Sequence, residues 1–348
     1  MKKCFYILFL FLSMPLWAQA QTRRASIPLQ HGAHRIGNRT DADMERWRQH
    51  GLGQFIHWGV YAIPGGFWEG KCYPGAAEWI RSWKEMPKDA YDSLYKQFNP
   101  TSFDAKAWAK QARQMGANYM IFTTKHHDGF CLWPTRYTSH SVVSSPWKNG
   151  RGDVVWEVSE ACRRYGMKFG IYLSPWDRNK PCYGSGKEYD DYYLAQLTEL
   201  LTGYGDIFSV WLDGACGEGP NGKKQIYDWK RYYECVRKYQ PDACICVCGP
   251  DIRWCGNEAG DVRKSEWSVV PARTALAESV QERSQQTDDK EFRMRRITSD
   301  MEDLGSRRAL EGETNLIWYP AEVNTSIRPG WFYHPEEDDQ VKSLEELI

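Results

Sequence analysis

The chain has 348 residues, and its 45 lysines plus arginines balance 45 aspartates plus glutamates. A chain without net charge has no excess of positive charge to attract nucleic acid and no excess of negative charge to attract cations. We therefore expect no nucleic-acid partner and favour a neutral ligand. Tryptophan is abundant at 17 residues. Indole rings on loops after strands suit sugars, whose C–H faces stack on aromatic rings while their hydroxyls seek polar partners.

The N-terminus reads MKKCFYILFLFLSMPLWAQA, with two lysines, a short apolar run and small residues before Gln21. This is the pattern of a cleaved secretory signal, so we assign residues 1–20 to a signal peptide and expect export to the periplasm or the medium. A polar N-terminal segment follows at 21–42. No other stretch approaches the roughly 18 apolar residues that a membrane helix needs, so we expect no membrane span in the mature chain.

From residue 43, apolar segments with strand character alternate with segments of helical periodicity. The predicted strands are 53–61, 118–125, 168–174, 206–214, 243–249 and 315–323. The predicted helices are 103–116, 153–166, 190–205 and 228–241. In the second helix, Asp153 is the expected N-cap and Gly166 the expected C-terminal stop. This alternation predicts an α/β fold with parallel strands, and we favour a (β/α)8-like TIM barrel over a doubly wound sheet.

The strand count falls short of a closed barrel. Six strands are readable where eight are needed, and the charged region 260–314 reads mainly as solvated helices and loops. The chain ends at Ile348, inside SLEELI, a sequence that resembles the start of a helix. We therefore expect 43–348 to form a barrel-like catalytic domain with an incomplete C-terminal end, which leaves open whether the barrel is closed and active.

Ten cysteines remain after removal of the signal. Cys244, Cys246 and Cys248 alternate along one predicted strand and would share a face as small buried apolar side chains. No Cys-x-x-Cys pair occurs, so a cysteine metal site is disfavoured, whereas a disulfide remains open in an exported protein.

Polar residues follow the predicted strands at their carboxyl ends, where barrel enzymes build their active sites. They are His57, His126, His127, Asp128, Tyr172, Ser174, Asp213 and Glu258. Asp213 ends the apolar run VWLDG, and burying a carboxylate there costs several kcal/mol unless partners compensate. The residue is therefore either part of an active site or a hydrogen-bonded organiser of its loop.

Two carboxylates together with aromatic rings suggest glycoside hydrolysis. One acid protonates the departing oxygen and one carboxylate meets the oxocarbenium carbon. We assign the ionised role to Asp213 and the acid role to Glu258 in GNEAG, whose pKa would have to be raised for that work.

Several strings then resemble one known family. GQFIHWGVYAIPGG, FDAKAWAKQARQMGANYMIFTTKHHDGFCLW, KFGIYLSPWD and VWLDGA are similar to successive blocks of glycoside hydrolase family 29, the retaining α-L-fucosidases. GPDIRWCGNEAG and WYPAEVNTSIRPGWFYH further resemble the subfamily that prefers α-1,3 and α-1,4 linkages. The Asn-x-Pro-Pro type block and the C-terminal β-sandwich that family members usually carry are not found in this sequence.

The resemblance implies a role for each matching residue. Asp213 would be the nucleophile and Glu258 the acid/base, acting on a fucosylated oligosaccharide or glycoconjugate without a cofactor or a catalytic metal. The residues implied to hold fucose are His57, Glu78, Trp79, His126, His127, Tyr172 and Trp211. Asp251, Arg253 and Trp318 are expected on the aglycone side.

Two other functions compete with this hypothesis. The first is a metal-dependent barrel hydrolase with His57, His126, His127 and Asp213 as ligands, which is disfavoured because adjacent histidines on a strand end point in different directions. The second is a truncated, non-catalytic fucose-binding remnant, which the missing C-terminal blocks keep open.

Overall fold

The computed structural model describes residues 39–73, 77–82, 86–246, 249–256, 266–287, 304–329, 331 and 334–347. At its centre lies one five-stranded sheet, in which every pair of neighbouring strands is parallel. Its strands, in spatial order, are β1 (Gly53–Ile56), β4 (Tyr119–Lys125), β5 (Lys168–Leu173), β6 (Ser209–Trp211) and β8 (Cys244–Cys246). Since spatial order follows chain order, each strand is added at the same edge, as in successive units of a barrel.

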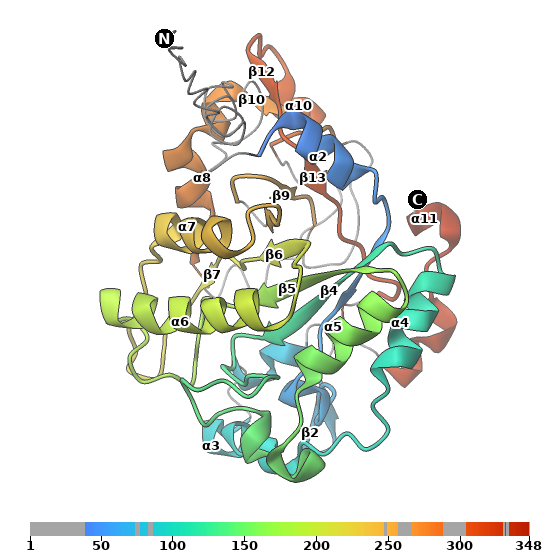
Figure 1. Ribbon diagram of the computed structural model, residues 1–348, viewed down its shortest axis with the longest axis vertical. Helices are drawn as coiled ribbons and strands as arrows, with labels where there is room; N and C mark the ends of the chain where they lie inside the picture. Colours follow the sequence, from blue (N-terminus) through green and yellow to red (C-terminus); the bar gives the residue numbers. More distant parts are fainter. Residues whose placement is uncertain are drawn as a thin grey trace, which may run out of the picture.

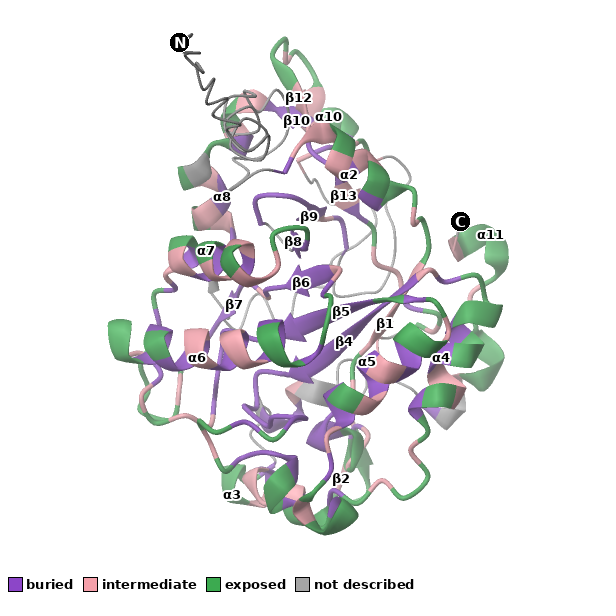
Figure 2. Ribbon diagram, in the orientation of Figure 1, coloured by how far each residue is buried: buried purple, intermediate pink, exposed green. Residues whose placement is uncertain are grey.

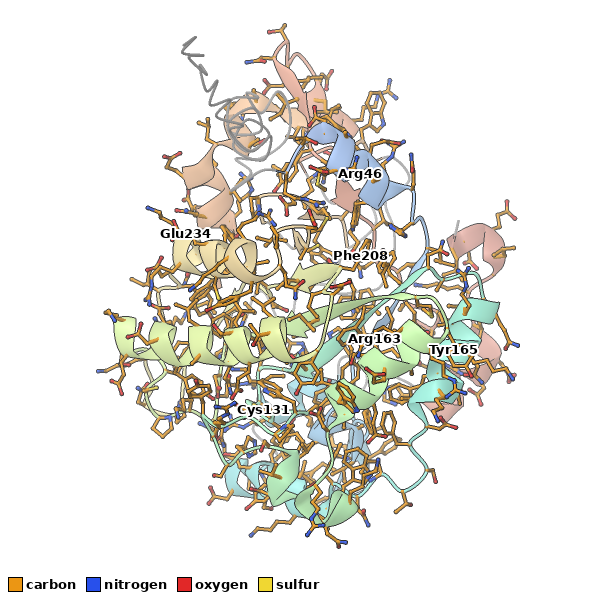
Figure 3. All side chains as sticks on the ribbon, in the orientation of Figure 1. Arg46, Cys131, Arg163, Tyr165, Phe208 and Glu234 are labelled. Carbon is orange, nitrogen blue, oxygen red and sulfur yellow. The ribbon has the colours of Figure 1, made fainter. Side chains whose placement is uncertain are left out.

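Four helices cover one face of this sheet (Figure 1). They are α4 (Ala105–Gln114), α5 (Val154–Arg164), α6 (Lys187–Gly203) and α7 (Trp229–Tyr239). The outward surfaces of α5 and α7 carry charged side chains such as Arg163 and Glu234, as Figure 3 shows. Helix α5 begins as predicted, because the carboxylate of Asp153 accepts the backbone N–H of Trp156 at 2.8 Å. Gly166 follows its end with φ +67°, which confirms the predicted stop.

The two faces of the sheet bury different apolar clusters. Strands β4, β6 and β8 are buried along their length, whereas β1 is half-buried (Figure 2). Phe122, Ile171 and Val210 pack toward the covering helices. On the opposite face, Ile121, Tyr172 and Trp211 form a second cluster, here called the inner cluster, with Met44, Trp47, Tyr119, Cys244, Cys246 and Ile252. This alternation is the two-residue period of a strand, and it explains why these strands read as continuous apolar runs.

The inner cluster is closed at one side by a helix that the sequence analysis did not predict. Helix α2 (Asp41–Arg48) begins within the polar N-terminal segment expected at 21–42. A capping box starts it, because Thr40 and Asp43 bond each other's backbone N–H groups. Met44 and Trp47 on this helix are buried in the inner cluster. The predicted signal peptide, residues 1–20, lies outside the described residues.

The strand predicted at 315–323 is two short strands, and neither joins the main sheet. β12 (Leu316–Trp318) pairs antiparallel with β10 (Val269–Pro271), and β13 (Ala321–Glu322) pairs parallel with β9 (Arg253–Trp254). Pro320 lies between β12 and β13 and has no N–H to donate to a ladder, which accounts for the interruption. The sheet formed by the described residues is therefore open, with β1 and β8 at its edges, and the expected (β/α)8-like barrel stays a prediction.

The remaining elements are short. The strands are β2 (Phe67–Trp68), β3 (Lys71–Cys72), β7 (Ala215–Cys216) and β11 (Gln286–Thr287). The α-helices are α3 (Lys88–Asp92), α8 (Ala277–Arg283), α10 (Arg307–Leu310) and α11 (Leu344–Leu347). The 3-10 helices are Val60–Ala62, Ala77–Ser82, Leu94–Gln97, Val142–Ser144, Trp147–Gly150, Ala272–Ala275 and Pro335–Gln340. In the described part of the chain, no helix has the length and apolar character of a membrane span.

The cysteines of the described residues are free thiols. Cys244 and Cys246 lie buried on the same face of β8, as the alternation predicted. Cys248 lies outside the described residues.

Candidate active site

Polar and aromatic side chains from four neighbouring strands meet at the carboxyl edge of the sheet. His57 follows β1, His126 and His127 follow β4, Tyr172 belongs to β5 and Asp213 follows β6. The ring of His126 stacks on Tyr172 at a centroid distance of 5.5 Å and an angle of 5°, and the ring of His57 lies 5.5 Å from both. The structure thus brings together these residues that the sequence predicted as one site.

Asp213 is the carboxylate at the centre of this group. Its side chain is 24% exposed. Tyr172 donates its hydroxyl to Oδ2 at 2.8 Å, and the backbone N–H of Ala215 donates to Oδ1 at 2.7 Å. Burial raises the pKa of Asp213, and the two donors oppose that rise by stabilising the ionised form. The arrangement holds a desolvated carboxylate in one orientation.

His127 lies beside Asp213, and its hydrogen bonds define its tautomer. Its Nδ1 is 2.6 Å from the hydroxyl of Ser174, whose single proton is donated to the carbonyl of Trp176 at 2.8 Å. Ser174 must therefore accept from His127, which places the imidazole proton on Nδ1. Nε2 is left as an acceptor, 3.9 Å from Oδ2 of Asp213. Either acceptor can take the single proton of a ligand hydroxyl bound beside them.

All three histidines of the site are held neutral. Desolvation by the surrounding protein lowers the pKa of His57 to about 4, although part of its side chain is exposed. Burial also lowers the pKa values of His126 and His127 well below the usual range, with smaller contributions from the neighbouring cations and imidazoles. Nδ1 of His126 is buried and has no hydrogen-bond partner among the described residues. Neutral imidazoles in a desolvated site are suited to hydroxyl groups, which can both donate and accept.

Aromatic rings enclose two sides of the group. Trp79 packs on His127 at a centroid distance of 5.1 Å, and Trp211 stacks on Tyr172 at 5.5 Å with an angle of 26°. The guanidinium of Arg178 lies over Trp176 at 4.7 Å and over Trp79 at 5.6 Å. Trp176 and Arg178 were not singled out by the sequence analysis, although both lie in the loop that follows β5.

A second carboxyl group lies close to this wall and was also missed. Nε1 of Trp211 donates to Oε1 of Glu322 at 2.8 Å. Burial raises the pKa of Glu322 to about 7, against the lowering effect of the indole N–H. The signal that could have found it is the one used for Asp213, a carboxylate inside an apolar strand, here NLIWYPAEV.

The residues expected on the aglycone side have other surroundings. Asp251 is fully buried and accepts from the guanidinium of Arg237 at 2.6 Å and from the backbone N–H of Ile245 at 2.8 Å. Arg253 is buried as well and pairs with Glu266 at 2.6 Å. These contacts hold both side chains in the segment after β8, and their place on the aglycone side stays a prediction. Trp318 is partly buried and packs against the inner cluster.

Two predicted residues cannot be placed in the site. Glu258 lies outside the described residues, and the side chain of Glu78 is likewise not described. The separation of Asp213 from its predicted partner carboxylate therefore stays a prediction. Within the described ranges, no group of three or more histidine, cysteine, aspartate or glutamate side chains is arranged to hold a metal ion.

Comparison with known proteins identifies the family to which this chain is similar. The family model described as Alpha-L-fucosidase matches residues 30–348. Alpha-L-fucosidase 1 of Arabidopsis thaliana is 37% identical over 295 residues, which cover 84% of this chain and 49% of the plant protein. The chain thus spans about half the length of this curated relative.

Two solved structures agree with that match. The crystal structure of a putative alpha-L-fucosidase from Bacteroides ovatus is 43% identical, with a TM-score of 0.69, and the match covers 92% of this chain and 52% of that one. A family 29 alpha-L-fucosidase from Bacteroides thetaiotaomicron, solved as a trapped covalent intermediate with 2-fluoro-fucosyl fluoride, is 37% identical with a TM-score of 0.52, covering 63% of this chain and 52% of that one. This chain belongs to the alpha-L-fucosidase family.

Proposed function

We propose that this chain carries the catalytic region of a retaining exo-α-L-fucosidase, which removes terminal L-fucose from glycans. The observation that carries the proposal is the carboxylate of Asp213, held by Tyr172 and Ala215 beside the neutral imidazole of His127. Family membership and the trapped covalent intermediate of the Bacteroides thetaiotaomicron relative support it.

The reaction proceeds by two displacements. Oδ2 or Oδ1 of Asp213 attacks the anomeric carbon, the glycosidic bond breaks, and the departing oxygen takes a proton from Glu258. Glu258 then removes a proton from water, the water oxygen attacks the anomeric carbon, and the ester to Asp213 breaks. L-fucose leaves with its configuration retained. For this mechanism the two carboxyl groups should lie about 5 to 5.5 Å apart.

The sugar is recognised by hydroxyl and ring contacts. His57, His126 and His127 exchange hydrogen bonds with the fucose hydroxyls, since neutral imidazoles donate at one nitrogen and accept at the other. Trp79 and Trp211 cover the apolar faces of the ring. Glu78 contributes a further acceptor.

The finer assignments rest on sequence resemblance. We propose a preference for α-1,3 and α-1,4 fucosyl linkages, with Trp318 on the aglycone side, because GPDIRWCGNEAG and WYPAEVNTSIRPGWFYH resemble the subfamily with that preference. The open parallel sheet would be the framework of a (β/α)8-like domain. We also propose export, with residues 1–20 as the cleaved signal and a periplasmic or secreted product.

The direct test is release of L-fucose by the purified chain. A Lewis-type trisaccharide with an α-1,3- or α-1,4-linked fucose is compared with an α-1,2-linked fucosyl disaccharide, and Asp213→Ala and Glu258→Ala serve as inactive controls. We expect release from the branched substrate and loss of activity in both variants.

The same assay distinguishes the enzyme from a fucose-binding remnant. A folded wild-type chain that binds L-fucose but releases none, with both variants indistinguishable from it, would reject the catalytic proposal. Equal release from the α-1,2-linked substrate would reject the linkage preference alone.

A further inference from the structure

Glu322 is a buried acid joined to the sugar site through one tryptophan. Its Oε1 accepts the indole N–H of Trp211 at 2.8 Å, across 111 positions of sequence. The residue is 7% exposed. Its other oxygen, Oε2, is buried without a hydrogen-bond partner among the described residues. A glutamine could accept the same indole proton without the cost of a buried charge, so packing alone does not account for an acid here.

The described ionisable groups around Glu322 do not stabilise a negative charge on its carboxylate. Its strand neighbour across β9 is Trp254. The ionisable groups of the described residues that respond to its charge are Tyr119 on β4 and Cys246 on β8. Burial raises the pKa values of both, so both are neutral at ordinary pH. No described cation therefore stabilises a negative charge on Glu322, and its proton is retained up to a pKa of about 7.

Trp211 connects this acid to the reactive carboxylate. Its ring stacks on Tyr172 at 5.5 Å, and Tyr172 donates its hydroxyl to Asp213 at 2.8 Å. The same indole meets the ring of Phe55 edge-on at 5.1 Å, and Phe55 stacks on His57 at 4.9 Å. A change in the tilt of Trp211 would therefore move two sides of the site.

We propose that Glu322 is a positioning residue of the fucose site, whose protonated carboxyl fixes the indole of Trp211 and whose loss of a proton loosens that wall and weakens sugar binding. The proposal rests on the proposed function, since it assumes that the site holds L-fucose. The indole N–H of Trp211 offsets only part of the cost of a buried charge on deprotonated Glu322, and the remainder is relieved by admitting water beside Trp211. Because linkage is reciprocal, binding of L-fucose then takes up protons at this residue.

The first measurement is calorimetric titration of the full chain with L-fucose at about pH 5.5 and about pH 8.5, in buffers of different ionisation enthalpy. The wild type should bind L-fucose about fivefold more weakly at the higher pH, which is a coupling at the lower end of the usual range. Binding of L-fucose near neutral pH should be accompanied by proton uptake. Glu322→Gln should lose this pH dependence and keep the affinity of the low-pH wild type. The exposed Glu278→Gln is the matched control and should behave as wild type.

Two further variants test the path through the indole. Trp211→Phe and Glu322→Leu should each weaken fucose binding at both pH values, and the double variant should be no weaker than the worse single one, because both remove the same hydrogen bond. Should the leucine variant fail to fold, the near-isosteric glutamine variant decides the question. A glutamine variant with the same pH dependence and proton uptake as wild type would overturn the proposal.

A readout independent of sugar binding separates this proposal from the proposed function. The indole N–H Raman band that disappears in Trp211→Phe should shift between the low-pH and high-pH wild type and stay constant in Glu322→Gln. If no L-fucose binds while this shift is seen, the fucosidase assignment fails and the link between Glu322 and Trp211 stands. A band that does not respond to pH would refute that link.

Discussion

Trp211 and Glu322 are joined by a hydrogen bond of 2.8 Å, although 111 positions separate them in the chain. Trp211 is the last residue of β6 in the central sheet, whereas Glu322 lies on a two-stranded ladder outside that sheet. The segment after residue 266 thus contributes to the site without adding a strand to the main sheet.

The raised pKa of Glu322 predicts a specific dependence of stability on pH. The carboxyl has an ordinary pKa of 4.5 when exposed and a pKa of about 7 in the folded chain. Between these values the folded state keeps a proton that the unfolded state has lost. Its stabilising contribution is therefore present in full below pH 4.5 and is lost as the pH rises through about 7, a total of about 3 kcal/mol.

Urea unfolding across this pH range checks the prediction. The free energy of unfolding of wild type should fall relative to that of Glu322→Gln as the pH rises, mainly between pH 4.5 and about 7. Parallel curves for the two proteins would show that Glu322 does not titrate in this range.

Tyr172→Phe should alter the pH profile of turnover. The variant removes the hydroxyl that stabilises ionised Asp213, so the pKa of Asp213 should rise further. Because the reaction needs the ionised carboxylate, the acidic limb of kcat/KM should move to higher pH. At a fixed pH on that limb, activity should fall about tenfold or more, the cost of one hydrogen bond to a charged group. An unchanged acidic limb would mean that Asp213 does not control it.

Ser174→Ala should weaken the site through His127. The hydroxyl of Ser174 keeps the imidazole proton on Nδ1, so its loss frees the ring to rotate or change tautomer. We expect kcat/KM to fall about tenfold, as for the loss of one buried hydrogen bond. Ser145→Ala is the control, because that hydroxyl is also buried and bonds a backbone carbonyl away from the site. Equal losses in the two variants would indicate a general effect on folding.

Asp251→Asn should destabilise the fold and leave sugar binding unchanged. Asp251 is fully buried against Arg237, and breaking a buried ion pair by removing one charge costs about 3 to 5 kcal/mol. In contrast, Asp191→Asn removes one partner of an exposed pair with Arg231 and should cost much less stability, because water screens charges at the surface. Urea unfolding measures the difference. A large rise in KM for the branched trisaccharide with folded Asp251→Asn would support its predicted role beside the aglycone.

Much of the sheet and one side of the site could be predicted from the sequence. The strand at 118–125 and helix 153–166 were found because their apolar periods are long and their caps are local signals, such as Asp153 and Gly166. Parallel strands place their carboxyl ends at one edge, so His57, His127, Tyr172 and Asp213 could be grouped without coordinates.

Long-range partners could not be predicted in this way. The family resemblance implied a place for Asp251 on the aglycone side, but nothing local in the sequence shows that Arg237 pairs with its carboxylate. Nor does the spacing show that Glu322 reaches Trp211, or that Pro320 divides the last predicted strand between two separate ladders. These contacts depend on how distant segments pack, which periodicity does not encode.

Asp213 should form a covalent bond to fucose during the reaction. Mass spectrometry of peptides from Glu258→Gln tests this after incubation with 2-fluoro-fucosyl fluoride, whose anomeric fluoride leaves readily and whose 2-fluorine slows hydrolysis of the intermediate. We expect one added 2-fluorofucosyl group, on the peptide that contains Asp213, and none in Asp213→Asn/Glu258→Gln. A label on a different residue, or fucose release by the wild type with no label in the variant, would contradict it.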